Sequence, residues 1–386
     1  MKFLLIVIFT LFESTQLKAE QNKFFVCKEK NFVDTIKITY ENDLIYIPIT
    51  INNTIYKFML DTGASIIILN EKQRNLMKEK NGKIRVGDTN NERRKELEQG
   101  ILHEMTLGKI HISDAKCCFI NDSILVRYDG ILGISTLITN GISFKIDTKK
   151  NIIILTDIKN YFENEQGYDI KYNSNKLLDI NFSMSHGCSG TARFDTGANL
   201  FITINKKDYF DKSIKGKDRE LFKKQIIWKD YGANKFGIHG IEKTDEHIFM
   251  QINELKLNNL ILKKIPAEIT HGHTLIGCKI LEYGSIIINP EMHKLKYQPY
   301  NFCDTIDINE NPRDITYTYE KGKISISMLN PNSHLFKQGL RKGDCLIEYN
   351  GIKFRNICDF LYSKKDADNK AKFQNAKGEI IDIILH

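Results

Sequence analysis

Apolar and polar residues alternate along much of the chain, a pattern that predicts β-strands. Between Ile45 and Ile51, isoleucine occupies every second position, which is the period of a half-buried strand. Asn52-Asn53 then predicts a turn, and Thr54 to Leu60 the return strand of a hairpin. Similar strands follow through most of the chain, interrupted by a charged stretch at residues 206–225 that predicts a helix. We therefore expect a mainly β fold.

The strand pattern occurs twice. A hairpin ending in Asp-Thr-Gly-Ala appears first at residues 58–64 and again at residues 192–198. A charged stretch and several strands follow each copy, and then an apolar-apolar-Gly element. This element is Leu132-Gly133 after the first copy and Ile276-Gly277 after the second. We interpret the pattern as the internal duplication of a β-rich lobe, with insertions.

The pattern changes near Ile315. Ile324 and Ile326 alternate with serines, a short helical stretch follows, and Asn350-Gly351 is a strong signal for a hairpin turn. This region has the size of a small independent αβ module. We therefore divide the chain into a leader, two β lobes and a C-terminal module, at residues 1–19, 35–158, 165–303 and 310–386.

The first residues predict a cleavable secretory signal. Lys2 supplies a positive charge, Phe3 to Phe12 is an apolar run broken only by Thr10, and Leu17-Lys18-Ala19 offers a cleavage site. The run is too short to span a bilayer, and no later segment is long and apolar enough. We expect a secreted or periplasmic protein without a transmembrane segment. Residues 20–36 are a candidate pro-segment that covers a cleft.

Composition narrows the function classes. Hydrophobic residues make up 41% of the 386 residues, enough for a sizeable core, and the net charge of +8 is spread along the chain. We therefore expect no nucleic-acid partner. The eight cysteines permit disulfides in an exported protein, but their pairing stays open. His271-Gly272-His273 lacks a third ligand at a recognisable spacing, so we expect no metal and no cofactor.

The chemistry points to a pair of carboxylates. Asp61 and Asp195 both end apolar strands that lead toward the interior. A buried carboxylate is costly unless it is paired or hydrogen-bonded, so two in equivalent places predict that each is the partner of the other. The alternative is two unrelated turns, which Asp and Gly commonly form, but these favour polar surroundings. A carboxylate pair that shares one proton can activate water for amide hydrolysis.

The two Asp-Thr-Gly motifs, each with its distant apolar-apolar-Gly element, resemble the aspartic peptidases of the pepsin and retropepsin clan over residues 35–300. The resemblance implies a two-lobed aspartic-protease β-barrel fold with catalytic Asp61 and Asp195. It also implies that the two glycine loops, the two threonines and the apolar-Gly strands support the catalytic loops. These supporting residues are Thr62, Gly63, Thr196, Gly197, Leu132, Gly133, Ile276 and Gly277.

The fourth motif residue is alanine in both copies, Ala64 and Ala198, which resembles the retropepsin side of the clan. Retropepsins usually pair two chains, whereas a duplicated chain forms the pair internally. We therefore expect a monomer with two-lobe pseudo-symmetry. In pepsin-like relatives the fourth residue carries a hydroxyl that can donate to the carboxylate and lower its pKa. Its loss predicts an activity optimum less acidic than that of pepsin.

The family usually covers its substrate with a glycine-containing hairpin. Gly87 and Asp88 mark one candidate in the first lobe, and Gly232 and Asn234 mark another in the second. Ordinary surface hairpins are the alternative interpretation of both.

The tail resembles the PDZ domains attached to exported proteases, through residues 330–333, 339–344 and 349–351. The resemblance implies that the module adds a peptide as an extra strand and holds its C-terminal carboxylate near the turn at residues 321–323. The residues expected at this site are Gly322, Lys323, Ile324 and Ile326.

These observations predict an exported aspartic endopeptidase that acts on a peptide or protein substrate. Its PDZ-like module is expected to dock a peptide or to regulate access to the cleft. Two alternatives stay open: a non-catalytic peptide-binding protein that retains the fold, and an inactive precursor.

Overall fold

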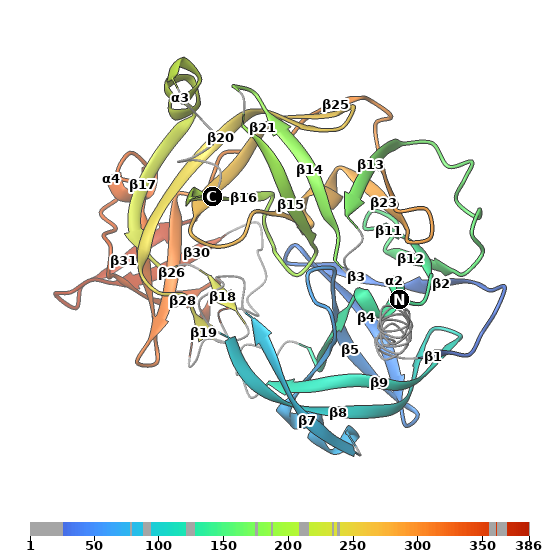
Figure 1. Ribbon diagram of the computed structural model, residues 1–386. Helices are drawn as coiled ribbons and strands as arrows, with labels where there is room; N and C mark the ends of the chain where they lie inside the picture. The colour runs from blue at the N-terminus through green and yellow to red at the C-terminus, as the bar shows by residue number, and fades with distance from the viewer. Residues whose placement is uncertain are drawn as a thin grey trace, which may run out of the picture.

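The computed structural model describes residues 26–77, 79–87, 94–120, 128–173, 177–186, 188–207, 216–233, 235–237, 240–354, 360 and 369–385. The expected signal at residues 1–19 lies outside these ranges, as do Asp88 and Asn234. Strands dominate the described chain, so the mainly β expectation is confirmed (Figure 1). No helix within the described residues is long and apolar enough to cross a membrane.

The first lobe is a barrel-like sheet of nine strands among the described residues, in the order β1-β9-β6-β10-β5-β4-β8-β7, with β3 on β4. β9 also pairs with β8, which curls the sheet. Its strands are β1 (Val26–Cys27), β3 (Thr39–Glu41), β4 (Leu44–Ile51), β5 (Thr54–Asp61), β6 (Ile67–Asn70), β7 (Glu79–Gly87), β8 (Arg94–Leu107), β9 (Ile110–Ile120) and β10 (Gly130–Gly133). Two short helices, η1 (Glu71–Leu76) and α2 (Ser135–Ile138), follow β6 and β10.

The second lobe repeats this arrangement. Its strands are β14 (Asp179–Met184), β15 (Ser189–Asp195), β16 (Ile202–Asn205), β17 (Ile226–Gly232), β20 (Asp245–Leu257), β21 (Leu260–Thr270), β22 (Leu275–Gly277) and β25 (Thr305–Asp307). In both lobes the motif strand runs parallel to the apolar-Gly strand, β5 beside β10 and β15 beside β22. The charged stretch contains helix α3 (Gly216–Lys223), and the second lobe adds a small hairpin of β18 (Phe236–Gly237) and β19 (Gly240–Ile241).

A central sheet joins the lobes. It combines β2 (Val33–Lys37), β11 (Ser143–Asp147) and β12 (Ile152–Thr156) with β13 (Tyr168–Asn173), β23 (Gly284–Asn289) and β24 (Lys294–Pro299). The two halves meet where β11 pairs antiparallel with β23. Because the equivalent strands of each lobe meet in one continuous sheet, the chain forms an internal pair of lobes.

The segment proposed as a pro-segment is partly built into these sheets. Val26 and Cys27 pair with β9 of the first lobe, and β2 pairs with β12 of the central sheet. The structure therefore favours a structural role for residues 26–36 over a removable cover. It also begins the first lobe before the predicted boundary at residue 35.

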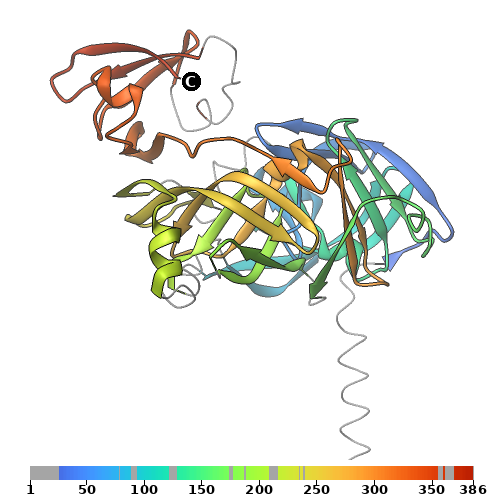
Figure 2. The same ribbon diagram turned by 90° about the horizontal axis from the view of Figure 1, so that it is seen from above.

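The C-terminal module has a sheet and a core of its own. Its elements are β26 (Ile315–Glu320), β27 (Lys323–Leu329), α4 (His334–Lys337), β28 (Cys345–Tyr349), β29 (Ile352–Lys353), β30 (Lys370–Gln374) and β31 (Ile380–Ile384). Its core includes Ile324, Leu340 and Phe373, all buried. Figure 2 shows this module, in orange and red, beside the second lobe.

The module packs directly against β17 of the second lobe. Trp228 stacks on Phe249 with ring centroids 4.0 Å apart, and Met328 of the module completes this small buried cluster. The Trp228 indole donates to the carbonyl of Arg313 (3.1 Å), and the Ala233 N–H donates to Ser327 Oγ (2.9 Å). Apolar burial and paired polar groups together favour a fixed module over a loosely tethered one.

Candidate active site

Asp61 and Asp195 occupy the same place in the two lobes, at the last residue of β5 and of β15. The Gly63 and Ala64 N–H groups donate to Asp61 Oδ1 at 2.7 and 3.1 Å, and the Gly197 N–H donates to Asp195 Oδ1 at 2.9 Å. Asp195 is 6% exposed and Asp61 is partly buried. Backbone donors thus compensate part of the cost of bringing each carboxyl into the interior.

The two carboxyl groups hydrogen-bond to each other. Burial raises the pKa of Asp61 well above its usual range, and the charge of Asp195 raises it further. Burial also raises the pKa of Asp195, against the hydrogen bond from Asp61, the Gly197 N–H and the charge of Arg193. Two adjacent carboxylates repel each other, so the pair retains one proton that neither group carries alone.

Each motif glycine lies against the opposite aspartate. A Cβ at Gly63 would lie 2.6 Å from Cγ of Asp195, and one at Gly197 would lie 2.8 Å from Cγ of Asp61. Any side chain at these positions would therefore push the carboxyl groups apart. The close approach of the two lobes is thus the reason that both positions require glycine.

The two threonines form a reciprocal bridge. The Thr62 N–H donates to Thr196 Oγ1 (3.0 Å), and the Thr196 N–H donates to Thr62 Oγ1 (2.9 Å). The Thr62 hydroxyl then donates to the carbonyl of Phe194 (2.6 Å), and the Thr196 hydroxyl to that of Leu60 (2.7 Å). Both threonine side chains are completely buried. They tie each motif loop to the strand that carries the other aspartate.

The apolar-Gly strands support the motif loops from the side. Gly133 pairs with Asp61, and Gly277 pairs with Asp195, each between parallel strands, while Leu132 and Ile276 point into the core. A Cβ at Gly133 would lie 2.4 Å from the carbonyl oxygen of Ile66, and one at Gly277 would lie 2.3 Å from that of Leu200. Only glycine allows such close backbone contact without displacing the loop.

The flap candidates separate into two cases. Gly87 ends β7 and is exposed, and no described residue beyond its chain neighbours lies within 4 Å of the position of a Cβ. Gly232 was predicted wrongly: it ends β17 under the C-terminal module, where a Cβ would lie 2.3 Å from Cγ of Met328. The second lobe also contains a separate small hairpin, β18–β19, between β17 and β20 in the sequence. Asp88 and Asn234 lie outside the described residues.

The expected peptide site of the C-terminal module also needs correction. Ile324 and Ile326 are only 3% and 2% exposed, within the module core. β27 pairs with β26 on one side and with β28 on the other. Lys323 is its first residue, paired with Glu320, and Gly322 lies in the turn from β26. A peptide strand therefore finds no free backbone at Ile324. Among the described strands, β26 and β31 form the two edges of this sheet.

The linker to the module contacts the second lobe beside its apolar-Gly strand, which the sequence analysis missed. Glu310 accepts from Lys279 Nζ (3.0 Å) and from the Tyr283 hydroxyl (2.9 Å). Lys279 belongs to η4 (Cys278–Glu282), the turn that follows Gly277. The same linker helps to enclose a pocket of about 290 Å³ beside Asn199 and Leu200, which follow the second motif. Residue spacing carried no signal for these contacts.

Cysteine and histidine side chains make no recognisable metal centre in the described ranges. No group of three or more potential ligands gathers there, and His271 pairs instead with Asp245. Cys117, Cys118, Cys188 and Cys278 are buried free thiols, and burial raises the pKa of each. Cys303 is free and exposed.

Comparisons with known proteins relate the first lobe to aspartyl proteases. Residues 47–139 match a family described as gag-polyprotein putative aspartyl protease, a range that includes Asp61 and Leu132-Gly133 but not the second motif. A solved aspartic proteinase from Irpex lacteus is similar at 13% identity with a TM-score of 0.46, over 70% of this chain and 98% of that chain. No curated protein matches. The first lobe is thus similar in sequence to aspartyl proteases.

Proposed function

We propose that this protein is an aspartic endopeptidase with Asp61 and Asp195 as its catalytic residues. The observation that carries the proposal is the reciprocal geometry of the two motifs. Each aspartate is held by N–H groups of its own loop, and the two carboxyl groups hydrogen-bond to each other. A pair of unrelated turns gives no reason for this symmetry.

The proposed mechanism needs no cofactor. The pair holds one proton, so one carboxylate accepts a proton from a water molecule while the protonated partner polarises the peptide carbonyl. The protonated partner can then donate its proton to the leaving nitrogen. The threonine bridge and the apolar-Gly strands keep the carboxyl groups in register, so little rearrangement is required during the reaction.

The C-terminal module is proposed to be a PDZ-like peptide-binding module. Its open edge strand, β26, offers unpaired backbone groups for an added strand. The bond from Ala233 to Ser327 and the linker contacts of Glu310 connect the module to the second lobe. These contacts support a regulatory role beside a docking role. Residues 1–19 are proposed as a secretory signal, which implies a secreted or periplasmic enzyme. The two lobes within one chain support a monomer.

Hydrolysis of casein from pH 3 to 8 tests the proposal. The wild type is compared with Asp61→Ala and Asp195→Ala, with and without a pepstatin-type transition-state analogue. Asp114→Asn, which changes an exposed aspartate paired with His103, is the matched control. We expect each dyad variant to lose roughly 10⁴-fold or more in kcat, and the control to retain activity.

The result also separates the two main alternatives. Activity that survives in both dyad variants would contradict the proposed catalytic pair. A wild type that binds the analogue tightly but cleaves nothing would favour a peptide-binding protein that retains the fold. N-terminal sequencing of the secreted protein addresses the precursor alternative, because an active protein that begins near residue 20 has lost only its signal.

A further inference from the structure

The turn η4 connects the apolar-Gly strand of the second lobe to the loop that carries Asp195. It begins directly after Gly277, which pairs with Asp195 between parallel strands. The Cys278 N–H donates to the carbonyl of Ala198 (2.8 Å), the residue that follows the second Asp-Thr-Gly motif. A shift of η4 therefore moves the loop whose Gly197 N–H donates to the Asp195 carboxyl group.

The two lobes fasten this turn in different ways. In the first lobe the equivalent turn is α2, where Ser135 is the second residue after the strand glycine. Its hydroxyl donates to the carbonyl of Ser65, in the loop after the first motif, so the first lobe fastens its own turn. In the second lobe the same place belongs to Lys279, whose side chain reaches Glu310 instead. The second turn is thus fastened by a residue of the linker.

Glu310 accepts hydrogen bonds from both ends of this region. One carboxylate oxygen lies 3.0 Å from Lys279 Nζ, and the other lies 2.9 Å from the Tyr283 hydroxyl. The Lys279 ammonium also lies 4.8 Å from the centroid of the Phe201 ring. The Lys279 and Glu310 side chains are only 22% and 34% exposed, so water competes less than at a fully exposed ion pair. Burial and the hydrogen bond to Glu310 raise the pKa of Tyr283, so its hydroxyl stays a donor.

The linker that carries Glu310, residues 308–314, is itself fixed to the second lobe. Gln251 Nε2, on β20, donates to the carbonyl of Glu310 (2.7 Å). Farther along, the Trp228 indole donates to the carbonyl of Arg313 (3.1 Å), where the C-terminal module packs against β17. The linker therefore runs from the contact surface of the module to η4, and Glu310 is the residue that meets the turn.

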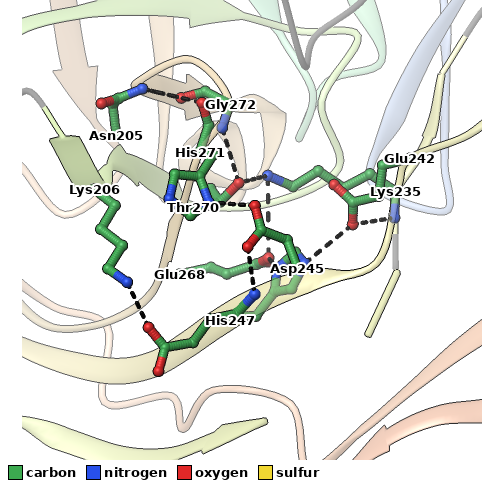
Figure 3. A network of polar contacts seen from close by, with 11 residues as sticks. Asn205, Lys206, Lys235, Glu242, Asp245, His247, Glu268, Thr270, His271 and Gly272 are labelled. Atoms are coloured by element: carbon green, nitrogen blue, oxygen red, sulfur yellow. Dashed lines mark hydrogen bonds and ion pairs between the residues drawn. The ribbon is translucent and has the colours of Figure 1, made fainter. Parts of the chain in front are cut away.

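A pocket of about 290 Å³ separates part of the linker from the second lobe. Its lining includes Lys279, Glu310 and Asn199, the last of which follows the second motif. It also includes Glu268, whose carboxylate lies 2.5 Å from Nδ1 of His247 in a buried polar cluster of the lobe (Figure 3). Because this space interrupts close packing, the side-chain contacts of Glu310 are needed to hold the linker against η4.

We propose that Glu310 is a positioning residue for Asp195, and that the linker of the C-terminal module thereby completes the support of the second aspartate. The inference rests on the proposed function, because it concerns the geometry of the proposed catalytic pair. Glu310 acts through Lys279 and Tyr283 and takes no part in the proton transfers. Since the same linker ends where the module meets Trp228, a peptide that shifts the module would also shift η4. This is a route by which the module regulates the pair.

The experiment compares five full-length proteins, of which one is the wild type. Glu310→Ala removes both contacts, Glu310→Gln removes the charge but retains an acceptor, and Tyr283→Phe removes one hydroxyl. Asp307→Asn is the matched control, because Asp307 lies on β25, just before the linker, and forms an exposed pair with Lys264 (3.0 Å). Steady-state hydrolysis of a peptide from pH 3 to 8 gives kcat, KM and the two limbs of the pH–rate profile.

We expect Glu310→Ala to lower kcat by about tenfold or more, with KM changed less than about threefold. A looser Asp195 loop also separates the two carboxyl groups, which weakens both their hydrogen bond and their repulsion. The acid limb should therefore move up and the alkaline limb down, so that the profile narrows by about one pH unit. Glu310→Gln and Tyr283→Phe should lie between this variant and the wild type, and Asp307→Asn should match the wild type.

The shape of the profile separates positioning from other effects. Loss of a charge alone moves both limbs in the same direction, so a parallel shift in Glu310→Ala would overturn the proposal. A lower kcat with an unchanged profile would also overturn it, because that is the result of fewer folded molecules. If Glu310→Ala does not fold, Tyr283→Phe decides by the same criteria, since it removes a single hydroxyl group.

Failure of the proposed function gives a different result. A wild type that hydrolyses nothing contradicts the peptidase, and amide hydrogen exchange then replaces kcat as the readout. Glu310→Ala should speed exchange at Gly197 and Cys278 by about tenfold or more, and leave Ile138, in the equivalent turn α2, unchanged. Unchanged exchange at Gly197 and Cys278, or faster exchange spread evenly over the second lobe, would overturn the positioning role.

Discussion

Thr62 and Thr196 hydrogen-bond to each other's backbone across the boundary between the two lobes. Each N–H donates to the hydroxyl oxygen of the other residue, at 3.0 and 2.9 Å. Because each hydroxyl also donates to the strand before the opposite motif, the two aspartates have one shared support. A disturbance of one loop therefore reaches both carboxyl groups.

Replacing Thr62 with valine should destabilise the protein, although the two side chains have almost the same shape. The substitution leaves the buried Thr196 N–H and the Phe194 carbonyl without their partners, at about 1–3 kcal/mol each. We expect a total loss of about 2–5 kcal/mol in urea unfolding, together with lower activity. Thr62→Ser retains the hydroxyl and should recover most of this loss. Equal stability of the valine and serine variants would contradict the bridge.

A methyl group at Gly133 should disturb the loop of the first Asp-Thr-Gly motif. Its Cβ would lie 2.4 Å from the Ile66 carbonyl oxygen and 2.8 Å from that of Ala64, both backbone atoms. We expect Gly133→Ala to lose about 1–3 kcal/mol or more, as overpacked interiors do. Gly87→Ala is the stability control, because apart from its chain neighbours no described residue has an atom within 4 Å of its Cβ position. Equal unfolding temperatures of Gly133→Ala and Gly87→Ala would refute this explanation.

Asp61→Asn should stabilise the protein at neutral pH. The pKa of Asp61 is raised in the folded state, so the folded chain retains its proton while the unfolded chain releases it. Stability from this group is therefore complete below the unfolded pKa and falls as the pH rises toward the folded pKa. The amide side chain of the Asp61→Asn variant does not ionise, so the variant does not lose this stability as the pH rises. Unfolding curves of the two proteins should converge below about pH 4 and separate above it.

Adding a hydroxyl beside Asp61 should shift activity toward acid. The Ala64 N–H already donates to Asp61 Oδ1, and its methyl side chain offers no further donor. A serine hydroxyl that donates to the ionised carboxylate lowers the pKa of the pair, so the alkaline limb of the pH–rate profile moves down. We expect about one pH unit for Ala64→Ser. An unshifted profile, or a wild-type optimum well below about pH 3, would count against the role of the alanines.

The local pattern of apolar and polar residues was sufficient to predict the strands and their duplication. The isoleucine period at Ile45 to Ile51 and the turn at Asn52-Asn53 correspond to β4, β5 and two positive φ angles of 50° and 61°. The two Asp-Thr-Gly motifs marked the residues that the structure brings together. These signals were readable because strand period and turn chemistry depend on neighbours in the sequence.

Which of the predicted surfaces are buried depends on pairing between distant segments of the chain. The sequence predicted Gly232 in an exposed hairpin, but the C-terminal module covers it. It predicted Ile324 at a peptide-binding site, but strands flank this residue on both sides. His247 gave no signal in the sequence, since a histidine in an apolar strand looks the same whether or not buried carboxylates lie beside it, as Glu268 and Glu242 do here. Sequence by itself determined the elements and the two aspartates that the structure brings together. Tertiary structure decided which surfaces stay open, because burial depends on segments that meet only in the folded chain.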